Sequence, residues 1–168
     1  MKFREKHPEI LERFEKFWRG EDTDRPVLVL NYVKDASVAP PEYERPVDRL
    51  RPEMMLASAR CKLARTGYLA EGFPHFFVNY GPGVLHACLT GGDLHVRDER
   101  TIWFPHFLEE LEDFERLDFE PEGRWWSTIR ETTRLLLAEV GDEIVVSYTD
   151  IGGNADVLAS ARGTEAFL

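Results

Sequence analysis

The residue best placed for chemistry is Asp150. It follows the apolar run 144–148 and stands just before the pair Gly152 and Gly153. In parallel α/β proteins, ligands bind at the carboxyl ends of strands, and glycine lets the backbone approach a ligand closely. We therefore expect Asp150 to act as an acid/base or polar anchor for a small-molecule substrate, with both glycines in the binding site. The alternative is that its carboxylate only caps the turn that follows.

Two other apolar runs of the chain also end in polar side chains. If the three runs are neighbouring parallel strands, their ends meet on one face, where convergent polar groups form a ligand-binding mouth. Each of these groups alone is more often a hydrogen-bonded loop residue, so the repetition at three runs carries the prediction. The further substrate-binding residues predicted in this way are Asn31, Tyr32, Asn79, Tyr80 and Tyr148.

No metal site is predicted from the spacing of histidine and cysteine. The histidines show neither the i, i+4 nor the His-x-His spacing common in zinc sites, and the cysteines form no Cys-x-x-Cys pair. We expect structural or surface histidines and two reduced, buried thiols. The residues concerned are His75, His86, His95, His106, Cys61 and Cys88.

The composition limits the possible partners. Acidic residues number 31 against 21 basic ones, a net charge of −10, so neither nucleic acid nor an anionic membrane surface is an expected partner. No apolar run approaches the ~18 residues of a membrane span. The 168 residues, 43% of them hydrophobic, suffice for one domain. The expected setting is cytoplasmic.

Helical and extended patterns alternate along the chain, which is typical of βαβ units with a mostly parallel sheet. The predicted fold class is therefore α/β, with an antiparallel hairpin as an excursion from the sheet. The expected strands are 27–32, 75–79 and 144–149, and the hairpin is expected near 93–104. The expected helices run from Pro8 to Gly20, from Pro52 to Gly67, and over 112–117, 124–140 and 154–163, and an extended segment is expected at 106–111.

Several segments, in this order and spacing, resemble the uroporphyrinogen decarboxylase superfamily. The resemblance implies a TIM-type (β/α)8 barrel of roughly twice this length, of which residues 1–168 form the N-terminal half: a single, apparently truncated decarboxylase-like domain. The half-barrel alone is expected to be inactive. The segments that carry the resemblance are 25–30, 76–85, 125–126 with the helix after them, 148–158 and 162–163.

The resemblance is closer to the corrinoid-linked methyltransferase branch than to the decarboxylase proper. The decarboxylase has an arginine-rich loop after its first strand and an aspartate after its second; this chain has one lysine, Lys34, and Asn79 there. Methyl transfer or demethylation is therefore expected. In full-length relatives this activity implies a corrinoid protein as partner and zinc as cofactor, with zinc ligands in the other half of the barrel, so no metal is expected here.

Two alternatives stay open beside methyl transfer. The chain is a non-catalytic fragment that only binds a ligand, or one that self-associates through the edges and apolar inner face of an open half-barrel. True uroporphyrinogen decarboxylation is the less favoured alternative, because a neutral amide at Asn79 cannot stabilise a cationic pyrrole intermediate.

Overall fold

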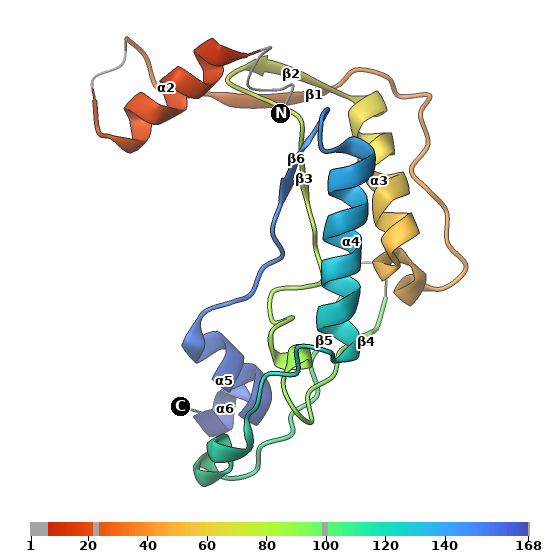
Figure 1. Ribbon diagram of the computed structural model, residues 1–168, viewed down its shortest axis with the longest axis vertical. Helices are drawn as coiled ribbons and strands as arrows, with labels where there is room; N and C mark the ends of the chain where they lie inside the picture. The colour runs from red at the N-terminus through yellow and green to blue at the C-terminus, as the bar shows by residue number, and fades with distance from the viewer. Residues whose placement is uncertain (1–6, 22–23, 99–100, 168) are drawn as a thin grey trace.

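Two helices, α3 (Pro52–Arg65) and α4 (Arg124–Val140), form the largest packed unit of the fold. The structure is a computed structural model that describes residues 7–21, 24–98 and 101–167. Both helices run in the same direction, with their amino-terminal ends together (Figure 1). Proline suits the first turn of α3, because N–H groups in a first turn have no partner within the helix and proline has no N–H group. The first N–H groups of both helices therefore point toward the same end of the molecule.

Strands β3 (His75–Phe77) and β6 (Val145–Ser147) pair in parallel beside these helices. The prediction of parallel strands at 75–79 and 144–149 is thus confirmed, although both strands are shorter than predicted. Parallel strands need a long crossover connection, and here it includes α4. Because the strands are parallel, the chain leaves both of them from the same edge of the sheet.

The hydrophobic core lies between α3, α4 and the segment that follows β3. Val78, Tyr80 and Val84 of that segment are almost completely buried, and so are Ile129 and Leu136 on the facing side of α4. Burying side chains of this size stabilises the fold by about 1.5–3 kcal/mol each. The core therefore fixes the position of the segment that leads from β3 into the loop 81–83.

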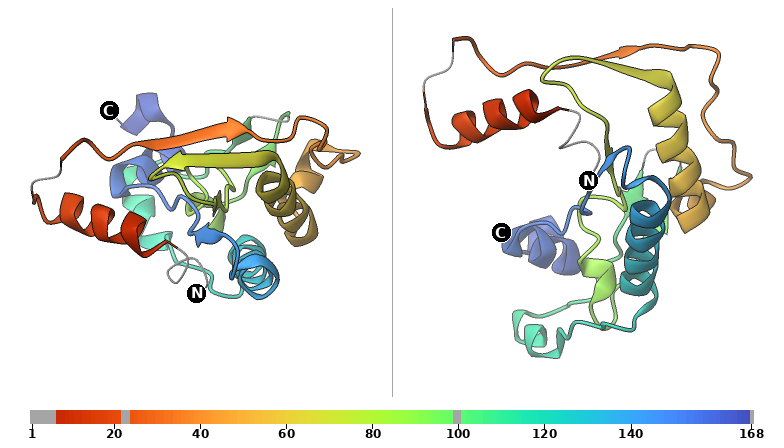
Figure 2. Two further views of the ribbon diagram at one scale, coloured as in Figure 1. Left: turned by 90° about the horizontal axis from the view of Figure 1, so that it is seen from above. Right: turned by 45° about the horizontal axis from the view of Figure 1, so that its top comes forward.

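The first predicted strand does not join this parallel sheet. β1 (Val29–Val33) pairs antiparallel with β2 (Thr66–Ala70), a strand that was not predicted, and the two form a separate ribbon that spans the distance between α2 and α3 (Figure 2). All five residues of β1 are exposed. A continuous apolar run is typical of a strand covered on both faces, but this run lies in an exposed ribbon. The ring of Tyr32 lies over Gly67, where a Cβ atom would overlap it.

A buried carboxylate ties the ribbon to the first helix, α2 (Pro8–Trp18). Glu71 accepts two hydrogen bonds from Arg25, at 2.8 and 2.5 Å, and one from the Leu28 N–H at 2.8 Å. Nε of Arg13, on α2, lies 3.2 Å from the same carboxylate. The hydrogen bonds from Arg25 and Leu28 lower the pKa of Glu71 to about 2. Ion pairing thus positions α2.

The expected hairpin forms from β4 (His95–Val96) and β5 (Ile102–Trp103). Part of its turn, Glu99 and Arg100, lies outside the described residues. The segment 106–110 forms no strand. It is hydrogen-bonded to α5 instead, because the Phe107 and Leu108 N–H groups donate to the carbonyl of Ala161. The remaining elements are the 3₁₀ helices η1 (Pro46–Leu50), η2 (His86–Cys88) and η3 (Leu111–Arg116), and the helices α5 (Asn154–Arg162) and α6 (Thr164–Phe167).

The architecture is therefore mixed α/β, with three two-stranded sheets, one of them parallel, among the described residues. These sheets do not close into a barrel. The helices expected over 112–117, 124–140 and 154–163 are confirmed by η3, α4 and α5, and the helix predicted from Pro52 ends at Arg65, before Gly67.

Candidate functional site

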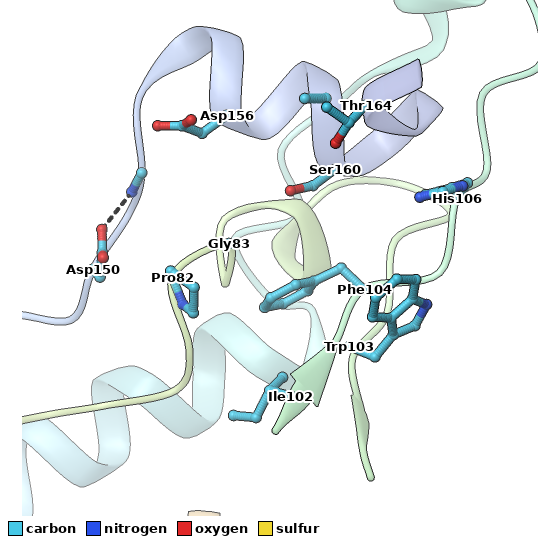
Figure 3. A pocket seen from close by; sticks show the side chains of 12 residues that line it. Pro82, Gly83, Ile102, Trp103, Phe104, His106, Asp150, Asp156, Ser160 and Thr164 are labelled. Carbon is cyan, nitrogen blue, oxygen red and sulfur yellow. Dashed lines mark hydrogen bonds between the residues drawn. The ribbon is translucent and has the colours of Figure 1, made fainter. Parts of the chain in front are cut away.

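A pocket of about 570 Å³ lies beyond the shared edge of β3 and β6 (Figure 3). Four parts of the chain surround it: the loop after β3, the hairpin strand β5 with the residues after it, the loop after β6, and α5 with the start of α6. Its walls are formed by Pro82, Gly83, Ile102, Trp103, Phe104, His106, Asp150, Gly152, Asp156, Ala159, Ser160 and Thr164.

Asp150 stands at the edge of this pocket, where the chain leaves β6. Its Oδ1 atom accepts a hydrogen bond of 2.9 Å from the N–H of Gly152, which fixes the orientation of the carboxylate. Gly152 has a φ of +71°, a conformation that side chains other than glycine rarely adopt. No hydrogen bond from the described residues reaches Oδ2 of Asp150, so this oxygen is available to a ligand. Asp150 thus caps the turn, as the alternative predicted, and also lines the pocket.

A second carboxylate, Asp156, lines the same pocket from the first turn of α5. Its Oδ2 accepts a hydrogen bond of 3.3 Å from the Gly153 N–H, so it also caps the helix. Ser160 lies one helical turn further along α5 and lines the pocket too. Gly153 itself does not line the pocket; its N–H holds Asp156 in place.

Glycines let the walls of the pocket approach one another. A Cβ atom on Gly83 would lie 3.0 Å from the ring of Phe104 and 3.2 Å from Oγ of Ser160. At the junction of α5 and α6, Gly163 has a φ of +94°, and a Cβ atom there would lie 2.8 Å from the ring of His106. Larger residues at these two positions would push the walls apart or intrude on the cavity.

The pocket combines acidic and aromatic surfaces. Among the described residues that line it, Asp150 and Asp156 are acidic and none is a lysine or an arginine, while Trp103 and Phe104 supply a flat apolar wall. Carboxylates beside an aromatic face attract a cation or a group rich in hydrogen-bond donors. The pocket therefore favours a small organic ligand with a positive charge or several donors.

Behind the Phe104 wall lies His86, which is completely buried between Phe104 and Phe107. Burial lowers the pKa of His86 to about 4, so its imidazole is neutral near pH 7. A nearby Pro105 carbonyl offsets part of this shift, although neither ring nitrogen forms a hydrogen bond of good geometry with the described residues. His86 thus packs behind the pocket wall, whereas His106 lines the pocket itself.

Of the eight predicted site residues, Asp150 and Gly152 line the pocket and Gly153 adjoins it. Asn79 accepts a 2.9 Å hydrogen bond from the Gly81 N–H and shapes the loop before the pocket. The predicted convergence of three strand ends was wrong, because β1 pairs with β2, so Asn31 and Tyr32 lie in the other sheet.

The two other tyrosines lie elsewhere. Tyr80 is buried in the core, where its hydroxyl donates to the Leu50 carbonyl at 3.0 Å and lies 2.6 Å from Oγ1 of Thr132. Tyr148 is 81% exposed and outside the pocket wall. Asn31, Tyr32, Tyr80 and Tyr148 therefore do not join Asp150 in one site, since one is in the core and the others face solvent.

Sequence reasoning missed most of the pocket wall, including Trp103, His106 and Ser160. Two signals pointed to it. The Gly81 to Gly83 segment indicated a tight backbone passage, and the four-residue spacing of Asp156 and Ser160 places both on one face of a helix. No comparable signal in the sequence indicates that the hairpin lines the pocket. Its place in the wall depends on how the hairpin packs against the loops after β3 and β6.

No protein-family model, curated protein or solved structure matches this chain. No helix within the described ranges is long and apolar enough to cross a membrane. The same ranges contain no group of three His, Cys, Asp or Glu side chains arranged to hold a metal ion. The functional interpretation therefore rests on the geometry of the pocket.

Proposed function

We propose that the pocket at the end of β6 binds a small organic cation or donor-rich substrate, with Asp150 as its principal polar contact. The observation that carries this proposal is that the loops after the two parallel strands, at 82–83 and 150–152, line one pocket. This is where α/β enzymes commonly bind their substrates.

The finer proposal is that these elements belong to a (β/α)8-type barrel of the uroporphyrinogen decarboxylase superfamily, in its methyl-transfer or demethylation branch. Parallel β3 and β6, with α4 returning between them, agree with such a barrel. This proposal includes a corrinoid protein as the methyl-carrying partner and a zinc ion that activates a thiol acceptor. Only the resemblance to the superfamily supports these two parts. True uroporphyrinogen decarboxylation is less favoured, because the residues after the first apolar run include Lys34 but no arginine, and Asn79 is a neutral amide.

Asp150 can orient a substrate and hold a proton. The Gly152 N–H fixes one carboxylate oxygen, so the other can accept a hydrogen bond from an ammonium or hydroxyl group of the substrate. If the substrate carries a proton that must leave, the same oxygen can take it. Trp103 and Phe104 pack against the apolar part of the substrate and exclude water from it.

Titration with tert-butylammonium tests the binding site, and tert-butanol, which has nearly the same size and shape, is the uncharged reference. We expect the cation to bind more tightly than the alcohol, and Asp150→Asn with Asp156→Asn to weaken cation binding by about tenfold or more. Glu143→Gln removes one negative charge from an exposed position near β6 and should leave binding almost unchanged. Equal binding of cation and alcohol, or equal loss in the Glu143 variant, would contradict the proposal.

Self-association is a second candidate, and the exposed ribbon favours it. Leu28, Leu30, Val33 and Leu69 are each more than two-fifths exposed, and within the described part of the chain neither strand of the ribbon pairs with a third strand. Such a surface pairs readily with another copy. Light scattering across a concentration series should then show a dimer, and the Leu30→Lys variant should be monomeric. A monomer at every concentration would rule out this candidate.

A further inference from the structure

A second pocket, of about 240 Å³, lies where η1 meets the first turns of α3 and α4. It shares no wall residue with the pocket beyond β6. Three arginines, Arg45, Arg51 and Arg124, line it, and the only carboxylate among its wall residues is Asp48. The pocket is therefore locally positive in a chain whose net charge is −10. A general acidic surface does not account for this concentration of arginines.

Asp48 neutralises only part of this positive charge. It is buried, and it pairs with Nη2 of Arg45 at 2.9 Å and with Nη2 of Arg51 at 2.8 Å. The Arg45 guanidinium and backbone N–H lower the pKa of Asp48, so it is ionised near neutral pH. Each guanidinium carries five N–H donors, so both arginines keep donors for another acceptor. Asp48 thus orients two cations toward one space.

Arg124 is the third cation and is oriented by stacking. Its guanidinium carbon lies 4.5 Å from the centre of the Trp125 ring, and Trp125 is itself held by a 2.8 Å hydrogen bond from Nε1 to Oδ1 of Asp93. No carboxylate in the described part of the chain forms an ion pair with Arg124 at salt-bridge distance. The charge of Asp93 interacts with that of Arg124, but no ion pair holds the guanidinium, so it keeps donors for an external anion.

The two helices reinforce the positive potential. They run in the same direction (Figure 1), and residues of both first turns line this pocket, so the positive ends of both helix dipoles lie beside it. The residue before α4 is Gly123, which has no side chain to cap the first N–H groups, and Arg51 before α3 forms no side-chain cap either. Two like poles side by side repel one another, and an anion between them relieves that repulsion.

We propose that this pocket binds an oxyanion with at least two anionic oxygens, as a free phosphate or as the phosphate group of a larger ligand. Arg51 and Arg124 donate to the anion in the forked geometry that guanidinium groups use with phosphate. Arg45 completes the charge, and Asp48 is a positioning residue that holds Arg45 and Arg51. The site is independent of the function proposed for Asp150.

Calorimetric titration with inorganic phosphate at low salt tests the site, and pyrophosphate and succinate form parallel arms. We expect saturable phosphate binding that weakens as NaCl screens the charges. Tighter binding of pyrophosphate would indicate that a larger phosphate ligand is the natural one, and succinate should bind more weakly. Arg51→Gln and Arg124→Gln should each weaken phosphate binding by about tenfold.

Matched controls separate a site from general electrostatics. Arg60→Gln on α3 and Arg134→Gln on α4 remove the same charge from exposed positions outside the pocket and should leave binding within about twofold of the original chain. Arg124→Lys keeps the charge but loses the fork, so it should also bind weakly, and circular dichroism shows whether each variant is folded. Absence of saturable phosphate binding, or equal weakening by the control variants, would overturn the proposal.

Discussion

The structure contains two regions that are apolar in sequence but are stabilised differently. In the body formed by α3, α4, β3 and β6, large side chains such as Leu136 and Ile144 are almost completely buried. In the β1–β2 ribbon, side chains of the same kind, such as Val29 and Leu30, are about half exposed. The body is held by apolar packing, whereas the ribbon is held by its backbone ladder and by the ion pairs of Glu71.

This contrast shows that local apolar content does not report burial. The segment at 27–30 is as apolar as the segment at 144–146. What differs is the neighbour that each segment finds: α4 covers β6 and its surroundings, but no helix covers β1 in the same way. A strand reveals its burial only through the packing of the whole fold, which is also why the ribbon is the surface most available to a partner.

The largest expected difference between the two regions comes from matched leucine truncations. Leu136→Ala should destabilise the chain by about 2–5 kcal/mol, because it leaves a cavity in the core. Leu30→Ala should change the free energy of unfolding by no more than about 0.5 kcal/mol in the monomer, because the side chain is already solvated. Urea unfolding of both variants measures this difference, and similar costs would break the contrast.

The buried hydrogen bonds of Tyr80 give the next effect. Tyr80→Phe removes the bonds to Leu50 and Thr132 and leaves a buried Thr132 hydroxyl without its partner, at a cost of about 1–3 kcal/mol. The double variant Tyr80→Phe with Thr132→Val removes both polar groups and should recover part of that loss. Thermal unfolding of the two variants checks this, and additive losses would contradict the pairing.

The ion pairs of Glu71 should affect the ribbon and α2 alone. Since the native pKa of Glu71 is about 2 and its ordinary value is 4.5, the carboxylate stabilises the fold above pH 4.5, and this contribution is lost as the pH falls toward 2. The amide resonance of Leu28, which donates to Glu71, should titrate around pH 2 in the folded protein, whereas amides of α4 should not.

The variant Glu71→Gln checks the same point near neutral pH. It should increase hydrogen exchange in β1 and β2 while the exchange of α4 amides stays unchanged. A uniform increase over both regions would mean that the ribbon and the body unfold as one unit, and the contrast would fail.

The smallest expected effect belongs to the surface ion pair that joins the two long helices. Arg60 on α3 and Glu139 on α4 lie 2.6 Å apart, and both side chains are about half exposed. Arg60→Gln should cost less than about 1 kcal/mol, since water screens such pairs. A larger loss in urea unfolding would mean that the body, too, depends on ion pairs.

Much of the element order could be predicted from the sequence. Proline marks the start of α3, and Gly123 and Gly141 flank α4 on both sides. The antiparallel ribbon could not be predicted, because Gly67 indicates a helix end just as well as it indicates a strand position under an aromatic ring. Pairing partners depend on long-range packing, which single-sequence patterns do not contain.

The candidate site was predicted at its centre and missed at its walls. The position of Asp150 and Gly152 follows from local rules, namely a strand end and a residue that needs a positive φ. Tyr80 obeys the same local rule, yet its ring turns into the core, where Thr132 and the Leu50 carbonyl offer hydrogen-bond partners. A polar residue after a strand can therefore line a pocket, as Asp150 does, or lie in the core, as Tyr80 does. Only the surrounding packing decides which of the two occurs.

The contact between Tyr32 and Gly67 has a consequence for how the ribbon is assembled. In a buried sheet, a shift of the strand register by one residue is disfavoured because it would turn apolar side chains to water. β1 is exposed, so burial does not specify its register in this way. Here the aromatic ring needs a position without a Cβ atom opposite it, and β2 offers one at Gly67, flanked by Thr66 and Tyr68. Gly67 thus selects a single alignment of β1 with β2, although every residue of β1 is exposed.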